Sequence, residues 1–279
     1  MKKIITSIIL FYSFTPLSAG DDFCSIHNHS FQNGESISYT VFYSIIGLYV
    51  NAGSANFTTR VENMNNKTAY HVVAVGSSNP SYDWIFKVRD RYESYFDTSN
   101  IQPLKFTRSV EEAGRKMSES VLFNQHDNTA TTNKGVFKVP GCIQDVLSAI
   151  YYARNINFSK YNVNDKIPFD MFLEDEVHPL YLRYLGKEIV KTRYGKFNSI
   201  KFSPLLVKGT IFAGGEKMTV WVSDDANHVP LRIESHIIGI NPTITYTNPN
   251  LIPLHKKFPL NKDFILSQNH NNAKHKTNA

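Results

Sequence analysis

The chain has 279 residues, a formal net charge of +6 and 42% hydrophobic residues. This composition is that of a globular protein, and the length allows one large domain or two small ones. The excess of positive charge is modest, and the Lys and Arg residues are interleaved with acids. The sequence therefore has no continuous basic surface for phosphates, and we expect no nucleic-acid partner.

The first residues have the three parts of a secretory signal. Lys2 and Lys3 precede an apolar run at 4–14, and small residues follow up to Ala19. The run is shorter than the about 20 residues that a membrane-spanning helix needs. We therefore expect a signal peptide at 1–19 and a flexible segment at 20–30. The mature protein should be exported, soluble in the periplasm or outer envelope, and without a transmembrane segment.

The sequence contains two cysteines, Cys24 and Cys142. In an oxidising compartment an even number of cysteines favours a disulfide. A bridge between them would close a long loop and stabilise the fold by about 4–5 kcal/mol in the chain-entropy model. The sequence leaves the bridge open, because Cys24 lies in the segment that we expect to be flexible.

Extended segments come first in the chain. Ile37, Tyr39, Val41 and Tyr43 alternate with more polar neighbours, which is the period of a strand. Short segments bounded by Asn, Ser, Pro, Gly or Asp predict further strands at 56–61, 69–75, 84–88, 91–96, 104–109 and 116–123. The polar residues at 124–134 predict a hairpin tip or a loop.

One helix is predicted in the middle of the chain, within GCIQDVLSAIYYAR at 141–154. Apolar residues fall at 143, 146, 147, 150, 151 and 153, which is helical spacing. Asp145 would lie in the first turn, where a negative charge favours the helix dipole. We expect this helix to be amphipathic and to begin at Ile143.

After residue 165 the pattern returns to strands, at 166–173, 178–185, 187–192, 197–202, 205–212, 218–223 and 230–238. We find no repeat of fixed period and no linker between 30 and 245. The sequence therefore predicts one β-rich domain at 31–245 and an extended, basic C-terminal tail at 246–279. The predicted fold is mainly β: a strongly curved, incompletely closed antiparallel sheet or barrel. One central amphipathic helix should pack on its concave side.

Several stretches together support a family resemblance. They are FQNGESISY at 31–39, VRDRYESYFD at 88–97 with Pro103, PGCIQDVLSAIYYAR at 140–154, GKF at 195–197, and WVSDDANHVPLRIES at 221–235 with Gly239. With these the chain resembles the bacterial exported family catalogued as domain of unknown function 3108. The family implies no established activity. Its plan is similar to that of lipoprotein carriers, a curved, incompletely closed antiparallel barrel with helical material across its mouth. Likeness of fold does not transfer function.

The helix and the aromatic residues supply the candidate binding site. Gln144, Ser148 and Tyr151 or Tyr152 recur at three- and four-residue spacing, and with Arg154 they could line a pocket. The alternative is that this polar edge of the helix only meets solvent. Tyr and Phe number 15 and 19, enough for an aromatic core or for an amphipathic cavity. The predicted ligand-binding residues are Tyr39, Tyr92, Gln144, Ser148, Ile150, Tyr151, Tyr152, Arg154 and Trp221.

The sequence contains no recognisable catalytic or metal-binding motif. Ser148 lacks a nucleophile elbow, and no particular His is implicated as a partner of Cys142. The ten His residues are dispersed, without zinc-site spacing. The consecutive acids at 174–176 and the pair Asp224 and Asp225 indicate solvated turns. We predict no catalytic residue, no metal and no cofactor, and lean against an enzyme without excluding one.

Three functions remain open at this stage. The first is an envelope protein that binds or carries a lipid or acylated molecule in a cleft between sheet and helix. The second is a structural or interaction scaffold that contacts an envelope protein, with a filled interior and an exposed apolar patch. The third is a glycan- or peptide-hydrolysing enzyme that uses Glu93, Asp97 or Asp145. The first is favoured over the third, because no compact catalytic spacing occurs.

Overall fold

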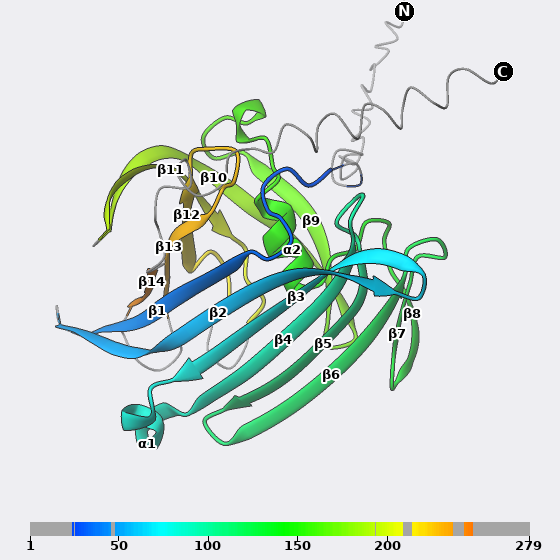
Figure 1. Cartoon of the computed structure of the whole chain (residues 1–279), viewed down its shortest axis with the longest axis horizontal. Helices are drawn as coiled ribbons and strands as arrows, with labels where there is room; N and C mark the ends of the chain where they lie inside the picture. The colour runs from blue at the N-terminus through cyan, green and yellow to red at the C-terminus, as the bar shows by residue number, and fades with distance from the viewer. Residues whose placement is uncertain are drawn as a thin grey trace, which may run out of the picture.

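The structure is a computed structural model of the chain (Figure 1). It describes Cys24 and residues 26–45, 48–192, 194–208, 214–236 and 243–247. The expected signal peptide lies outside the described residues, as does the expected tail from residue 248 onward. The last described strand ends at Thr247, two residues beyond the predicted end of the domain.

Strands dominate the described residues and form two halves. The first half contains β1 (Ser36–Ile45), β2 (Leu48–Met64), β3 (Lys67–Ser78), β4 (Val88–Asp97), β5 (Pro103–Glu112), β6 (Arg115–Asn124), β7 (Thr129–Thr132) and β8 (Gly135–Lys138). The second half contains β9 (Lys166–Leu173), β10 (Glu176–Thr192), β11 (Gly195–Pro204), β12 (Met218–Ser223), β13 (Pro230–His236) and β14 (Thr243–Thr247). The predicted mainly-β fold is confirmed.

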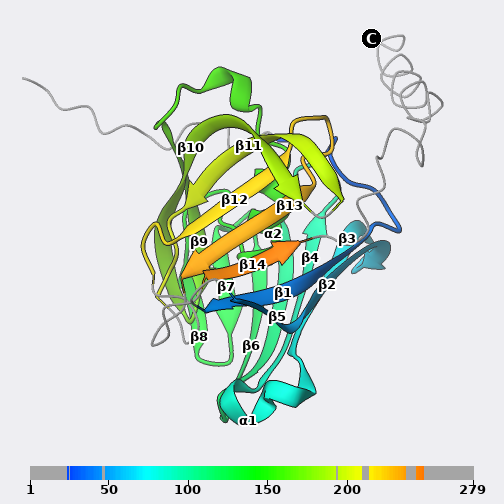
Figure 2. The same ribbon diagram turned by 90° about the vertical axis from the view of Figure 1, so that its left-hand side faces the viewer.

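All pairings between neighbouring named strands are antiparallel, and the pairing of β1 with β14 joins the two halves. Strands β8 and β9 stand at the two ends of the order, so the sheet is not closed, as predicted (Figures 1 and 2). The edge of β9 is covered by the segment before the helix. Gln144 donates its backbone N–H to Asp170 O at 2.9 Å and accepts one from Phe172 at 2.9 Å. This pairing hides part of an edge that would otherwise be exposed.

Tight turns connect many of the strands. Asn65 and Asn66, between β2 and β3, have φ values of 51° and 64°, and Glu174 and Asp175, between β9 and β10, have 55° and 64°. Both residues of such a two-residue hairpin lie in the left-handed region, which matches the twist of the flanking strands. The predicted turn at Glu174 and Asp175 is therefore confirmed.

Three of the predicted elements differ from the structure. The segment 84–88, predicted as a strand, contains the short helix α1 (Asp83–Phe86) and only the first residue of β4. The segment 124–134, predicted as a hairpin tip or a loop, contains two hairpin turns with the short strand β7 between them. The predicted strand at 205–212 forms only a bridge between Leu206 and Gly215, and residues 209–213 lie outside the described residues. At 84–88, local polar contacts that are described below hold a helical turn in spite of the strand pattern of the sequence.

The central helix is shorter than predicted, and its burial differs from the predicted pattern at Ser148 and Ile150. Helix α2 runs over Val146–Ala153, eight residues, because Asp145 caps it. The Asp145 carboxylate accepts hydrogen bonds from the backbone of Leu147 and Ser148, while Ser148 Oγ accepts one from the backbone N–H of Asp145. Ser148 is fully buried, whereas the apolar Ile150 is 39% exposed. The prediction of a central amphipathic helix was therefore wrong.

The core combines both halves of the sheet with the helix. One cluster of buried residues includes Val72 and Phe106 from the first half, Leu147 and Tyr151 from α2, and Phe202 from the second half. Helix α2 contacts β4 and β9, and lies between the two halves in Figure 1. None of the described helices is long and apolar enough to cross a bilayer.

Candidate ligand-binding face

The face of strands β1–β6 that packs on α2, here called the inner face, is organised in rows of directly paired residues. The row nearest to α2 consists of Thr59, Val72, Ser94, Phe106 and Val121. All five have an exposed fraction of 0%. At this row the inner face is closed.

Helix α2 and its cap cover the closed row. Tyr151 Oη lies 2.8 Å from Thr59 Oγ1, and Ser94 Oγ donates to the Asp145 carboxylate at 2.5 Å. Burial raises the pKa of Asp145 to about 6, while the hydrogen bonds from Ser94, Ser148 and Leu147 act in the opposite direction. The helix is thus fixed to the sheet by buried polar contacts as well as by apolar packing.

Two further rows extend from the closed row toward α1, and they are less covered. The middle row is Ile37, Phe57, Ala74, Tyr92, Arg108 and Glu119, and the outer row is Tyr39, Ala55, Gly76, Asp90, Val110 and Met117. We call these two rows the open rows. Phe57, Tyr92, Ala55, Gly76, Asp90 and Met117 are all half-buried. Along β2, β3, β4 and β6 the inner face therefore changes from closed to partly accessible within four residues, whereas β1 and β5 stay buried in both open rows.

Small residues occupy the middle of the open rows. Ala55 pairs with Gly76 in the outer row, and Phe57 pairs with Ala74 in the middle row. Large side chains stand on either side, with Tyr39 at one end of the outer row and Met117 at the other. A strip of small residues between larger apolar ones is a shape that an extended apolar group could occupy.

Charged side chains gather at the β4–β6 end of the open rows. Arg108 Nε lies 2.7 Å from Glu119, and Arg108 Nη2 lies 2.9 Å from Glu174 at the β9–β10 turn. Burial, and then the neighbouring Glu112 carboxyl, raise the pKa of Asp90 to about 7. Burial also raises the pKa of Tyr92 to about 12. The open rows thus combine an apolar strip with a polar end.

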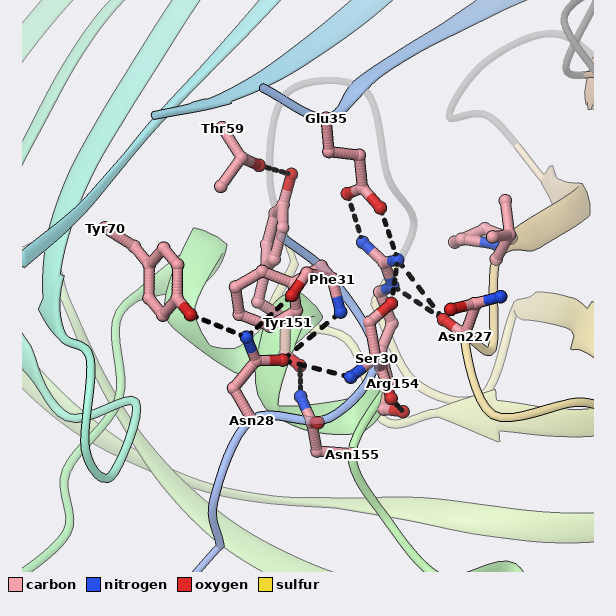
Figure 3. A network of polar contacts seen from close by, with 12 residues as sticks. Asn28, Ser30, Phe31, Glu35, Thr59, Tyr70, Tyr151, Arg154, Asn155 and Asn227 are labelled. Atoms are coloured by element: carbon pink, nitrogen blue, oxygen red, sulfur yellow. Dashed lines mark hydrogen bonds and ion pairs between the residues drawn. The ribbon is translucent and has the colours of Figure 1, made fainter. Parts of the chain in front are cut away.

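At the C-terminal end of α2, Arg154 forms a buried polar network (Figure 3). Its guanidinium pairs with both carboxylate oxygens of Glu35, at 2.6 and 2.8 Å, and donates to the backbone oxygens of Ser30 and Asn227. It also lies over the rings of Phe31 and Tyr151. With a side chain only 2% exposed, Arg154 is a structural tie and not a residue available to a ligand.

Residues 26–30, which we expected to be flexible, lie against the domain. Asn28 Nδ2 donates to Tyr70 Oη at 2.8 Å, the His29 backbone donates to Asn155, and Ser30 Oγ donates to Arg154 O at 2.6 Å (Figure 3). Short polar side chains make these contacts without any periodic pattern in the sequence.

The structure also answers the question left open for the cysteines. Cys24 and Cys142 form a disulfide, with their Cα atoms 5.3 Å apart and 118 residues apart in sequence. The bridge ties the N-terminal segment to the residues just before α2.

The predicted ligand-binding residues separate into three places. Tyr39 and Tyr92 lie in the open rows. Gln144, Ser148, Tyr151, Tyr152 and Arg154 are buried in or beside α2, with exposed fractions of 2% or less. Ile150 is the exposed residue of α2. Of the first pair, Tyr92 is half-buried, whereas Tyr39 is only 4% exposed. Tyr92 therefore lies where a ligand could reach it, and Tyr39 is part of the core.

Trp221 lies apart from the other predicted residues. It packs with Val190 and Leu231, in a cluster separate from the main core. Its indole N–H donates to Glu188 at 2.5 Å. Because Val220 and Val222 face the core and strand residues alternate, Trp221 faces the outer side of the sheet.

The acids considered for hydrolysis do not converge. Glu93 pairs with His71 at 3.0 Å and with Arg91 at 2.6 Å, Asp97 accepts hydrogen bonds from Ser99, and Asp145 caps α2. No group of three or more His, Cys, Asp and Glu side chains among the described residues is placed to hold a metal ion.

A surface depression lies at the β10–β11 hairpin, away from the inner face. It is lined by Lys187, Glu188, Ile189, Asn198, Ser199 and Asp224. It is wide open to solvent, and Lys187 and Asp224 already pair there at 2.8 Å. We do not assign the ligand site to this depression, because it offers little enclosure.

Sequence reasoning missed the small and charged residues of the open rows. Ala55, Ala74 and Gly76 carry no functional signal of their own. Asp90 could have been found, because strand alternation places it on the same face as Tyr92, Ser94 and Phe96. A carboxyl on the apolar face of a strand is the informative exception.

Fold and site together define a class: an incompletely closed antiparallel sheet with a short, buried helix on its inner face. The chain belongs to a protein family of unknown function, DUF3108, whose model matches residues 38–239. This match confirms the resemblance. No curated protein sequence gives a significant match.

Two solved structures are similar to the chain at low identity. One is a β-barrel-like protein of the family of unknown function DUF1849 from Brucella abortus, with 9% identity, a TM-score of 0.48, and coverage of 76% of this chain and 94% of that chain. The other is a protein with a YmcC-like fold from Bacteroides fragilis, with 12% identity, a TM-score of 0.29, and coverage of 81% and 98%. We argue function from the site alone.

Proposed function

We propose that the chain is an exported protein of the cell envelope that binds an apolar ligand, a lipid or an acylated molecule, on the open rows of its inner face. The observation that supports this most is the change in burial along strands β2–β6. The row under α2 is completely covered. In the outer row, four residues further, Ala55, Gly76, Asp90 and Met117 are half-buried, between the buried Tyr39 and Val110.

An apolar strip that reaches solvent costs free energy unless something covers it. Each Å² of apolar surface removed from water contributes about 25 cal/mol. An acyl chain laid along the half-buried Ala55 and Gly76, next to the buried Ala74, would remove such surface and would meet no bulky side chain at these three positions. The rings of Phe57 and Tyr92 would border it.

The polar end of the open rows would orient the ligand. Arg108 is held by Glu119 and Glu174 at 2.7 and 2.9 Å, so its guanidinium has a fixed position. The Tyr92 hydroxyl and the Asp90 carboxyl stand in the same two rows. An amphipathic molecule, with an apolar chain and a polar head, fits this arrangement better than a pure hydrocarbon.

The experiment is native mass spectrometry, combined with solvent extraction, on the mature protein purified from a bacterial envelope fraction. We expect a protein that begins near residue 20, with a reproducible co-purifying lipid or acylated molecule. A full-length mass would overturn the export part of the proposal. A ligand-free mass that stays unchanged after incubation with envelope lipids would overturn the binding part.

The variant Gly76→Leu places a side chain in the strip. A Cβ at Gly76 would have its nearest contact with Asp90 Cβ at 3.9 Å, so the backbone tolerates the change. We expect the variant to fold and to lose the ligand. Val75→Leu is the matched control, because Val75 is the neighbouring residue on the opposite face and is 38% exposed. Equal ligand retention in both variants would contradict the assignment to the open rows.

A further inference from the structure

The connection between β3 and β4 is unusually long for a hairpin. It covers residues 79–87 and contains a 3₁₀ turn (Pro80–Tyr82) followed by α1, whereas hairpin loops commonly have about 2–5 residues. Both views place α1 beyond the end of the strands, so that it projects from the sheet (Figures 1 and 2). We call this connection the tip.

The tip exposes large apolar side chains. Trp84 is 82% exposed and Ile85 is 55% exposed, while Tyr82 and Phe86 beside them are half-buried. The indole N–H of Trp84 donates to Ser81 O at 3.1 Å. Since this is the only donor of the side chain, the exposed part of Trp84 is an apolar ring surface.

Polar contacts fix the backbone that presents these residues. Asp83 pairs with Arg89 at 2.5 Å and accepts a hydrogen bond from Ser78 Oγ at 2.5 Å. Ser78 Oγ in turn accepts one from the backbone of Val88 at 2.9 Å, and the Asn79 side chain accepts one from Ser81. The exposed pair is therefore held in place by its own set of contacts.

Two exposed cations lie beside the tip, Arg115 and Lys116. Lys87 pairs with Glu111 at 2.8 Å, and Lys87 O accepts a hydrogen bond from Ala113, so the β5–β6 turn lies beside the tip. Arg115 and Lys116 follow that turn and are exposed. Neither makes an ion pair within the part of the chain that the structure describes. With Asp83 and Glu111 each paired, the exposed charge left at the tip is positive.

We propose that the tip docks the protein on the surface of an anionic phospholipid bilayer, with Trp84 and Ile85 inserted among the head groups. Trp is the residue most suited to this depth, because its ring is amphipathic. Lys and Arg near the surface are attracted to anionic lipids. A specific protein interface buries about 800 Å² per partner, more than a narrow projection with two exposed apolar residues offers. The docking goes beyond the ligand site and does not depend on it.

The experiment uses the fluorescence of Trp84 in the mature protein. The chain has only 2 Trp, and Trp221→Phe leaves Trp84 as the single reporter. The probes are vesicles of phosphatidylcholine alone and vesicles with added phosphatidylglycerol, some with brominated acyl chains. With the anionic vesicles we expect Trp84 emission to shift to shorter wavelength and to be quenched by the brominated lipid. Salt should weaken both effects.

Co-sedimentation with the same vesicles keeps the test independent of the Trp221 substitution. The variant Trp84→Ser/Ile85→Ser should partition about 100-fold less to anionic vesicles, since two large apolar side chains are lost. Val136→Ser/Ile189→Ser is the matched control, because those residues are 69% and 62% exposed elsewhere. It should bind like the unmodified protein.

Two outcomes overturn the proposal. The first is Trp84 emission that neither shifts nor is quenched with anionic vesicles, which would leave the tip to a protein partner. The second is a tip variant that sediments like its control. The quenching measurement also separates the tip from the basic C-terminal tail, because a protein bound only through its tail would leave Trp84 unquenched.

Discussion

Arg154 is the residue on which three segments of the chain meet. From its position directly after α2, Arg154 pairs with Glu35 just before β1 and donates to Asn227 before β13. Its other bond goes to Ser30 in the N-terminal segment. A buried ion pair of this kind adds little net stability compared with an apolar pair, but breaking it leaves a charge without a partner.

We expect Arg154→Met to lower the free energy of unfolding by about 3–5 kcal/mol, because the Glu35 carboxylate loses both of its donors. Urea unfolding at neutral pH measures this. Arg183→Met is the matched control, since Arg183 pairs with Glu216 at the surface. It should change stability little, because exposed pairs are screened by water. Similar losses in the two variants would show that Arg154 is not a structural tie.

Asp90 gives the fold a pH dependence with a definite sign. Burial, with Glu112 second, raises its pKa to about 7, above the value near 3.9 expected in an unfolded chain. The contribution of such an acid to stability is complete below about pH 4 and is lost as the pH rises through about 7. Asp90→Asn should therefore gain stability relative to the unmodified protein between pH 5 and pH 8.

The measurement is urea unfolding of both proteins across that range. Glu216 supplies a control of opposite sign, because hydrogen bonds from Arg183 and Tyr181 lower its pKa to about 2. Its contribution is present above about pH 4, so the effect of Glu216→Gln should stay constant from pH 5 to pH 8. A constant difference for Asp90→Asn as well would mean that its carboxyl does not titrate in this range.

At the scale of elements, strand periodicity in the sequence predicted most strands correctly. Local polar contacts, in contrast, could not be predicted from the sequence. The alternation in residues 37–43 and 218–223 predicted β1 and β12, since one side of each strand faces the core. The segment at 84–88 failed, because the bonds among Ser78, Asp83 and Arg89 hold a helical turn where the apolar pattern indicates a strand.

The spacing of apolar residues located the central helix correctly. It did not predict which of the polar side chains of the helix are buried. Periodicity cannot tell a polar side chain that meets water from one that meets a buried partner. Ser148 and Asp145 bond to each other and to Ser94, so their side of α2 turns inward. Of the candidate site, only Tyr39 and Tyr92 could be proposed from sequence. The small residues opposite them become meaningful only once the register pairs Ala55 with Gly76.

At the scale of the molecule, two features have separate roles in this account. The inner face is closed beneath α2 and partly accessible beyond it, and the proposed ligand site lies in this accessible part. The tip between β3 and β4 exposes Trp84 and Ile85 at the end of the same strands. The β3–β4 hairpin would thus contribute residues both to the proposed ligand site and to the proposed contact with a bilayer.

The most direct measurement of the central claim is paramagnetic broadening of methyl signals by a spin-labelled acyl chain. We expect the methyl groups of Ala55, Ala74 and Met117 to broaden, since all three lie in the open rows. Those of Val75 and Ile189, which are exposed elsewhere, should stay sharp. Broadening at Val75 and Ile189 with none in the open rows would contradict a ligand site on the inner face.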